Sequence, residues 1–151
     1  MGLSLSLLFA SGCAYHFFSP GQRAIYVCQI ENLTQYAQME IFLTDEVRKA
    51  IVRFPGLTLV GSASQADAIV KVRLVSGERR PIFFSPDDSK KILIASVKIA
   101  AEVEITAPGK GTASKVIEES LPLSLRRAYV EETILEEISQ RLANRIVFLL
   151  R

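Results

Sequence analysis

Apolar positions in two segments recur at the helical period, and they predict two amphipathic helices. Residues 36–54 place apolar side chains three or four residues apart, at Met39, Leu43, Val47, Ala50, Ile51 and Phe54. Residues 130–150 repeat this spacing, with Leu135, Ile138, Leu142, Ile146 and Leu149. Such spacing gives each helix one buried stripe and leaves the other side to polar residues. Pro55 and Gly56 are expected to end the first helix.

Between these helices the apolar residues alternate with polar ones, which predicts β-strands. Residues 68–75 alternate apolar with basic side chains, and residues 96–106 alternate apolar side chains with Ser, Lys and Glu. Each of these strands has one wet face and one dry face, as in an antiparallel sheet covered on one side. Shorter strands are expected at 24–30 and 57–61. A further strand is expected at 115–127, edge-lying or bulged at Pro122 because proline cannot donate to a ladder.

The order of these elements predicts an α+β fold. We expect a two-layer sandwich with a mostly antiparallel four- to five-stranded sheet and two helices packed on one face, because every element has one apolar side to bury. The chain has 151 residues, of which 49% are hydrophobic and 23% are charged. These values suit a single globular domain, which we expect over residues 24–151.

The first 23 residues differ in composition from the rest of the chain and predict a targeting signal followed by a membrane anchor. Residues 3–10, LSLSLLFA, carry no charge and are far too short for a span of about 20 apolar residues. We expect residues 1–12 to be a signal peptide that begins before Met1, because no Lys or Arg precedes Arg23. The sequence Ala-Ser-Gly before Cys13 resembles a bacterial lipobox, so residues 13–23 are expected to be a lipidated tether. The alternative is a buried N-terminal strand with Cys13 in the core.

Candidate chemistry is sparse along the rest of the chain. The net charge of +2 and the scattered basic residues argue against nucleic acid as a partner. One histidine, His16, and two cysteines are too few for a zinc site or a disulfide framework, and Cys28 is expected to be a buried inert thiol. Adjacent glutamates point in different directions on a strand or a helix, so they form no acid–base dyad. We therefore expect no enzyme activity and no cofactor except acyl and diacylglycerol groups on Cys13.

The stretch GERRPIFFSPDDSKKILI, residues 77–94, joins the two long strands and is the main candidate binding site. It carries Phe83 and Phe84 between basic residues at Arg79, Arg80, Lys90 and Lys91. One interpretation is a long hairpin whose phenylalanines fold back onto the core. The other is a protruding tip that offers apolar and cationic groups together, which would suit a phosphate-bearing lipid or a partner protein.

With these elements placed, the sequence resembles the LptE family of outer-membrane lipoproteins. The resemblance rests on GCAYHF around Cys13, the first strand ending in IEN, and the helix LTDEVRKAIVRFPGLTLV. It continues through ADAIV, KVIEES and the final RLANRIVFLL. Only Cys13 can be carried over by position, as the acylated residue.

The resemblance implies a place and partners for the protein. It implies a non-catalytic lipoprotein of the cell outer membrane, lipid-anchored and facing the periplasm and the lumen of an LptD-type β-barrel. Such a protein would plug the barrel and assist lipopolysaccharide transport and assembly. Ala14, where an aspartate would favour inner-membrane retention, agrees with the outer membrane. Two alternatives stay open: a lipoprotein of the same fold serving another envelope lipid-transport or secretion system, and a soluble periplasmic enzyme.

Overall fold

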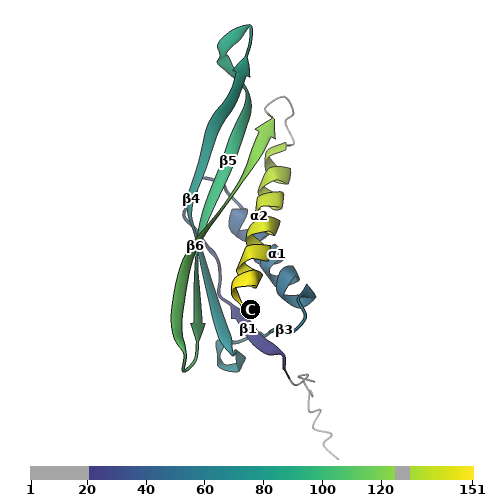
Figure 1. Cartoon of the computed structure of the whole chain (residues 1–151), viewed down its shortest axis with the longest axis vertical. Coiled ribbons are helices and arrows are strands. Elements are labelled where there is room, and N and C mark those ends of the chain that lie inside the picture. The colour runs from purple at the N-terminus through teal and green to yellow at the C-terminus, as the bar shows by residue number, and fades with distance from the viewer. Residues whose placement is uncertain (1–20, 125–129) are drawn as a thin grey trace, which may run out of the picture.

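The computed structural model of the chain describes residues 21–124 and 130–151 (Figure 1). These residues form six strands, two helices and a short 3₁₀ helix, Ala63–Gln65. The strands and helices are β1 Arg23–Val27, β2 Glu31–Asn32, α1 Met39–Arg53, β3 Leu57–Leu59, β4 Ala68–Ser85, β5 Asp88–Ala107, β6 Gly111–Ser124 and α2 Val130–Leu149. The signal peptide and most of the tether, including Cys13 and His16, lie outside the described residues, so the predictions made for them stay predictions.

The strands form one mixed sheet in the order β3-β1-β4-β5-β6, and β2 pairs with β4 beyond the end of β1. The three long strands β4, β5 and β6 are antiparallel neighbours, as predicted. In contrast, β1 runs parallel to both β3 and β4, and β2 runs parallel to β4. The α+β class is therefore confirmed, while the predicted count of four to five strands is wrong. Helix α1 crosses over between β1 and β3 and brings the chain back in the same direction, which residue periodicity cannot reveal.

The first predicted strand, residues 24–30, ends early at Val27, and a second short strand begins at Glu31. Both β1 and β2 pair with β4, Val27 with Val70 and Glu31 with Arg73. Between these two pairs the chain advances by four residues from Val27 to Glu31 but by only three on β4. The β1–β2 segment therefore contains one extra residue, as in a β-bulge. Strand β2 therefore lies just beyond the predicted range, in the segment ENLTQ.

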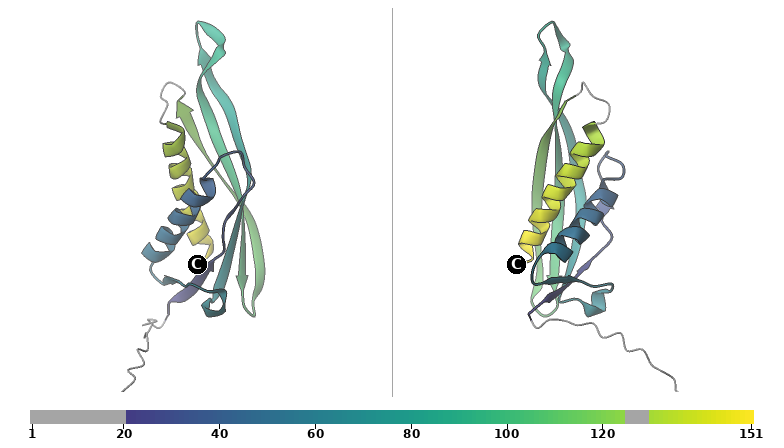
Figure 2. Two further views of the ribbon diagram at one scale, coloured as in Figure 1. Left: turned by 180° about the vertical axis from the view of Figure 1, so that it is seen from behind. Right: turned by 90° about the vertical axis from the view of Figure 1, so that its right-hand side faces the viewer.

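Both helices cover the same face of the sheet, which confirms the predicted layer arrangement (Figures 1 and 2). The buried side of α1 consists of Met39, Leu43, Val47 and Ile51, whereas Ala50 and Phe54 are only partly buried. On α2 the predicted residues Leu135, Ile138, Leu142 and Ile146 are buried, and Leu149 is partly buried. They meet the apolar faces of β4, β5 and β6 in one core. Neither helix among the described residues combines the length and apolar character needed to cross a membrane.

The other face of the long strands is covered by neither α1 nor α2 (Figure 2), and its side chains are largely polar and paired in charge. Arg73 on β4 and Glu102 on β5 form an ion pair of 2.5 Å across the two strands. Lys98 on β5 reaches Glu118 on β6 at 2.6 Å. Opposite charges on neighbouring strands stabilise a solvated sheet face. This face is therefore the solvent-exposed face that the alternating sequence predicts.

The two prolines of the long strands lie where the sheet has a free edge. Pro122 is in β6, which pairs only with β5, so the edge position predicted from the sequence is confirmed. Pro81 lies in the part of β4 beyond Leu74, where pairing is recorded with β5 alone. A missing N–H is tolerated on such an edge because no neighbouring strand requires it.

A loop before α1 packs against β4 where the long hairpin leaves the body. Asn32 organises this loop: its side-chain amide donates to the Tyr36 carbonyl at 2.8 Å and to Glu40 at 2.6 Å. The Tyr36 ring is buried against Gly77, and burial raises the pKa of its phenol above the ordinary value. A Cβ atom built on Gly77 would lie 2.8 Å from the Tyr36 ring. Gly77 is therefore required for this close approach.

We expect Gly77→Ala to destabilise the fold by about 1–3 kcal/mol, because the added methyl group overlaps a buried ring that has little room to move. Urea unfolding of the purified chain measures this change. Gly61→Ala is the matched control, since nothing lies within 4 Å of a Cβ atom at Gly61. Equal midpoints for the two variants would contradict the close contact between Tyr36 and Gly77.

Candidate functional site

The hairpin of β4 and β5 projects beyond the helices and ends at one extremity of the long axis (Figures 1 and 2). The last residue of β6, Ser124, pairs with Ile94 on β5. Of the described strands, β4 and β5 alone continue beyond that pair, to a turn at Pro86 and Asp87. Most of the segment 77–94, expected to be a connection, is therefore paired strand. Its sequence alternates less cleanly because this part of the hairpin lacks a covered face.

The end of the hairpin displays three consecutive apolar side chains, which we call the tip patch: Ile82, Phe83 and Phe84. Their exposed fractions are 58%, 50% and 44%. The interpretation in which Phe83 and Phe84 fold back onto the core is thus wrong. The register between β4 and β5 shifts around these residues, and irregular pairing of this kind re-aims side chains. The sequence analysis missed Ile82, although its position beside the two phenylalanines was the available signal.

The four basic residues of the segment do not form one cluster. Arg80 pairs with Glu78 at 2.5 Å, and Arg79 lies 4.0 Å from Glu131 at the start of α2. Being neighbours on a strand, these two arginines point to opposite faces. Lys90 and Lys91 lie farther out, between Asp88, which pairs with Ser85, and Ile92, which pairs with Phe84.

Positive charge at the outer end of the hairpin is therefore carried by Lys90 and Lys91 next to the tip patch. Both lysines are exposed, and no ion pair is recorded for either among the described residues. Asp87 and Asp88 occupy the turn beside them, and the Asp88 carboxylate accepts a 2.9 Å hydrogen bond from the Lys90 backbone N–H. The arrangement offers apolar anchors beside two exposed ammonium groups.

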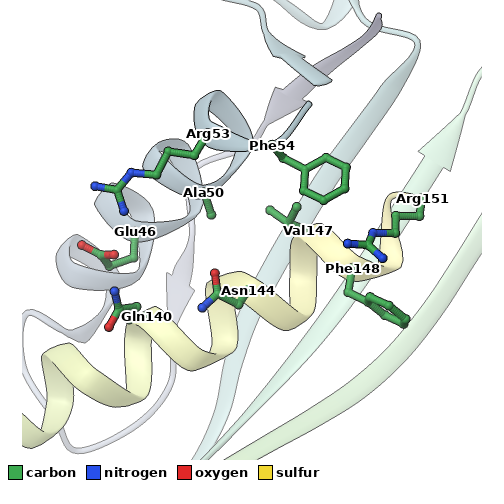
Figure 3. Close-up of a pocket in the computed structure, with 9 residues that line it drawn as sticks. All are labelled: Glu46, Ala50, Arg53, Phe54, Gln140, Asn144, Val147, Phe148 and Arg151. Carbon is green, nitrogen blue, oxygen red and sulfur yellow. The ribbon is translucent and has the colours of Figure 1, made fainter. Parts of the chain in front are cut away.

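A separate cleft of about 270 Å³ lies between the C-terminal parts of α1 and α2 (Figure 3). The guanidinium of Arg151 lies over two of its rings, 4.8 Å from the centre of Phe54 and 4.9 Å from that of Phe148. Glu46, at the other end, is paired with Lys49 at 2.8 Å. The cation–π contacts engage Arg151 and the ion pair engages Glu46. The lining residues of the cleft are Glu46, Ala50, Arg53, Phe54, Gln140, Asn144, Val147, Phe148 and Arg151.

The remaining candidate chemistry is limited in the part of the chain that the structure describes. Cys28 follows β1 as a half-buried free thiol, and its backbone N–H donates to the Val70 carbonyl at 2.9 Å. Within residues 21–124 and 130–151, no three His, Cys, Asp or Glu side chains gather as they would around a metal ion.

Comparison with known proteins finds the same fold in several solved structures. No protein-family model and no curated protein sequence matches the chain. The hypothetical protein CT253 from Chlamydia trachomatis aligns with a TM-score of 0.59 at 12% identity, over 85% of this chain and 95% of that one. Rare lipoprotein B from Shewanella oneidensis gives 0.55 at 16%, over 83% and 92%. The uncharacterized lipoprotein B from Nitrosomonas europaea gives 0.55 at 10%, over 89% and 92%. At these identities the likeness establishes a common fold, which spans most of every chain compared.

Proposed function

We propose that this chain is a non-catalytic outer-membrane lipoprotein that plugs an LptD-type β-barrel and assists lipopolysaccharide transport and assembly. The observation that carries the proposal is the shared fold with rare lipoprotein B, which extends over 83% of this chain and 92% of that protein. A fold alone hosts many functions. The cysteine-containing signal segment and the geometry of the hairpin supply the further support.

The length of the hairpin suits a protein that reaches through a barrel. Ile25 of β1 pairs with Ala68, so the chain enters the domain level with the start of β4. From there β4 runs to Ser85, which at about 3.3 Å per residue amounts to roughly 56 Å. A whole bilayer is about 40–45 Å thick including its headgroups. A domain anchored at its N-terminal end, with its long axis across the membrane, would therefore carry the tip patch past the opposite surface.

The polar face of the sheet also suits a barrel lumen. Its cross-strand pairs, Arg73 with Glu102 and Lys98 with Glu118, balance positive with negative charge. The interior of an outer-membrane barrel is polar, so these side chains would keep hydrated or hydrogen-bonded surroundings there. The lipid on Cys13 would hold the same molecule at the inner leaflet, since each buried CH₂ of an acyl chain contributes about 0.8 kcal/mol.

Affinity purification of the tagged chain from detergent-solubilised outer membranes tests the proposal. We expect a large β-barrel protein to copurify in stoichiometric amount. Recovery of the chain alone would overturn the proposal. Recovery with components of a different envelope system would do the same, and would favour the alternative lipoprotein function.

For the hairpin tip, we expect charge reversal of Lys90 and Lys91 together to weaken binding of purified lipopolysaccharide by about tenfold or more. Each lysine near an anionic lipid surface contributes about 1 kcal/mol, and a tenfold change corresponds to about 1.4 kcal/mol. Arg79 and Arg80 are also candidate contacts, but their pairing with Glu131 and Glu78 predicts a smaller effect for their reversal.

The control for that experiment changes net charge equally at another place. Arg48→Glu with Lys49→Glu reverses two exposed positive charges on α1. Binding of lipopolysaccharide to this control should stay near that of the unmodified chain, and thermal unfolding should show that all variants are folded. Undiminished binding by the Lys90 and Lys91 variant would remove these residues from the proposed contact.

A further inference from the structure

Within residues 21–124 and 130–151, strand β6 forms a long free edge of the sheet. It has 14 residues, and it pairs along its length with β5 alone. In an antiparallel pair, alternate residues turn both backbone groups toward the partner strand, and the residues between them turn both groups away. The residues of β6 that turn away from β5 therefore present unpaired N–H and C=O groups at the edge.

Two contacts identify the outward residues as the even-numbered ones. The carbonyl of Glu118 accepts a 2.6 Å hydrogen bond from the Arg145 guanidinium on α2, so this carbonyl faces away from β5. Pro122, which has no N–H to offer a ladder, has the same parity and still pairs in register with Ser96. The backbone groups of Thr112, Ser114, Val116 and Ser120 therefore face outward as well.

These features close one half of the edge and leave the other half open. The Glu118 carbonyl already accepts a hydrogen bond from Arg145. Farther along the strand, Pro122 has no N–H to donate to an added strand. Toward the β5–β6 turn, Thr112, Ser114 and Val116 are exposed, and their backbone groups receive no hydrogen bond from any described residue outside the sheet. We call this stretch, residues 112–116, the open edge.

An apolar cleft lies beside the open edge, between β6 and α2. It has a volume of about 420 Å³ and is lined by Lys115, Ile117, Asn144, Arg145, Phe148 and Leu149. Phe148 is 62% exposed, which is unusual for a phenylalanine in a folded domain. A strand edge next to a helix, with an apolar cleft between them, is an arrangement that binds extended peptides by strand addition.

On the cleft side of the open edge the unpaired charges are positive, while Glu104 of β5, in register with Ser114 on the other face of the sheet, has Lys71 as its neighbour on β4. Glu118 is paired with Lys98, and Glu119 is paired with Arg145 at 3.0 Å. Lys115 is exposed beside the cleft, and Lys110 lies in the preceding turn. Among the described residues no ion pair is recorded for either lysine. A segment that docks here would therefore be favoured by carboxylates near Lys115.

We propose that the open edge of β6 accepts an extended, acidic segment of a partner protein as an additional strand. The segment would exchange backbone hydrogen bonds with Ser114 and Val116, place one apolar side chain in the cleft against Ile117 and Phe148, and set a carboxylate beside Lys115. A second copy of this chain fits less well, because two-fold pairing would bring a second Lys110 and a second Lys115 to the same short stretch. The proposal does not rest on the function proposed above, because it concerns a surface away from the hairpin tip.

The test uses the full purified chain and a short synthetic peptide of alternating Thr and Val with a central Leu flanked by two Glu. We expect saturable binding by fluorescence anisotropy below about 1 mM. Methylation of alternate peptide nitrogens on the pairing side should abolish it, because strand addition needs those N–H groups. Replacement of both Glu by Lys in the peptide should weaken it.

The decisive variants differ only in where a proline is placed on β6. Val116→Pro removes an outward N–H in the open edge and should weaken peptide binding by roughly tenfold or more. Ser120→Pro removes an outward N–H beyond the Arg145 contact and should leave binding unchanged. Neither change interrupts the ladder with β5, and circular dichroism with thermal unfolding verifies that both variants fold.

Any one of the following results would overturn the proposal. The first is absence of peptide binding at about 1 mM. The second is an equal effect of the two proline variants, or binding that survives N-methylation. The third is a stable dimer in sedimentation that dissociates in Val116→Pro, which would make a second copy the occupant of the edge.

Discussion

Leu142→Ala is expected to lower the free energy of unfolding by about 3–5 kcal/mol, a cost typical of a leucine truncated in a well-packed core. Leu142 is fully buried, at 0% exposure, in the middle of the α2 stripe between Ile138 and Ile146. It belongs to the single cluster that joins both helices to the sheet. Its removal would leave a cavity that rigid neighbours on three elements cannot fill.

Leu33→Ala is the matched control for this prediction. Leu33 is 68% exposed in the loop after β2, so the same truncation removes few contacts there. The change should stay within about 0.5 kcal/mol. Urea unfolding followed by circular dichroism measures both variants, and similar m-values would show that the unfolding transitions are comparable. Equal stability of the two variants would contradict the placement of Leu142 in the core.

Cys13→Ser is expected to abolish acylation and to release the protein from the membrane fraction. This prediction rests on the proposed lipoprotein function and on the apolar segment that precedes Cys13. Serine lacks the thiol to which diacylglycerol is attached, and without acyl chains the domain loses its hydrophobic anchor. Labelling with radioactive palmitate, followed by membrane fractionation, measures both effects.

Cys28→Ser provides the control, because it makes the same chemical change at the other cysteine. Cys28 is half-buried after β1 and should keep its backbone contact with Val70 in the variant. Label should persist at full level in Cys28→Ser and vanish in Cys13→Ser. Label that persists without Cys13 would reject the lipid anchor, and the proposed location with it.

The candidate site was predictable in its composition and only partly in its arrangement. Phe83, Phe84, Lys90 and Lys91 stand out in the sequence because two aromatic residues lie between basic pairs in a segment expected to be a connection. Their exposure depends on how far β4 and β5 continue past the last residue of β6. Arg79 and Arg80 look equivalent to the lysines in the sequence, yet the fold pairs them with Glu131 and Glu78.

By itself, the sequence determined the elements and their buried sides. The apolar residues of α1 and α2 recur at the helical period because each helix buries one stripe, and that requirement acts locally on Met39 and Leu43 as it does on Ile138 and Leu142. The alternation in β4 and β5 arises in the same way from one covered face. The antiparallel order of the long strands follows from their direct succession along the chain.

The tertiary structure alone decided what depends on segments far apart in the chain. The parallel pairing of β1 with β3 and β4 requires the crossover through α1, and β2 exists because β4 continues past the end of β1. The open edge of β6 and its cleft arise where Arg145 and Phe148 of α2 come to lie beside Lys115 and Glu118. Such features depend on which surfaces meet, and a residue pattern records only that a surface is apolar or polar, not which other surface it meets.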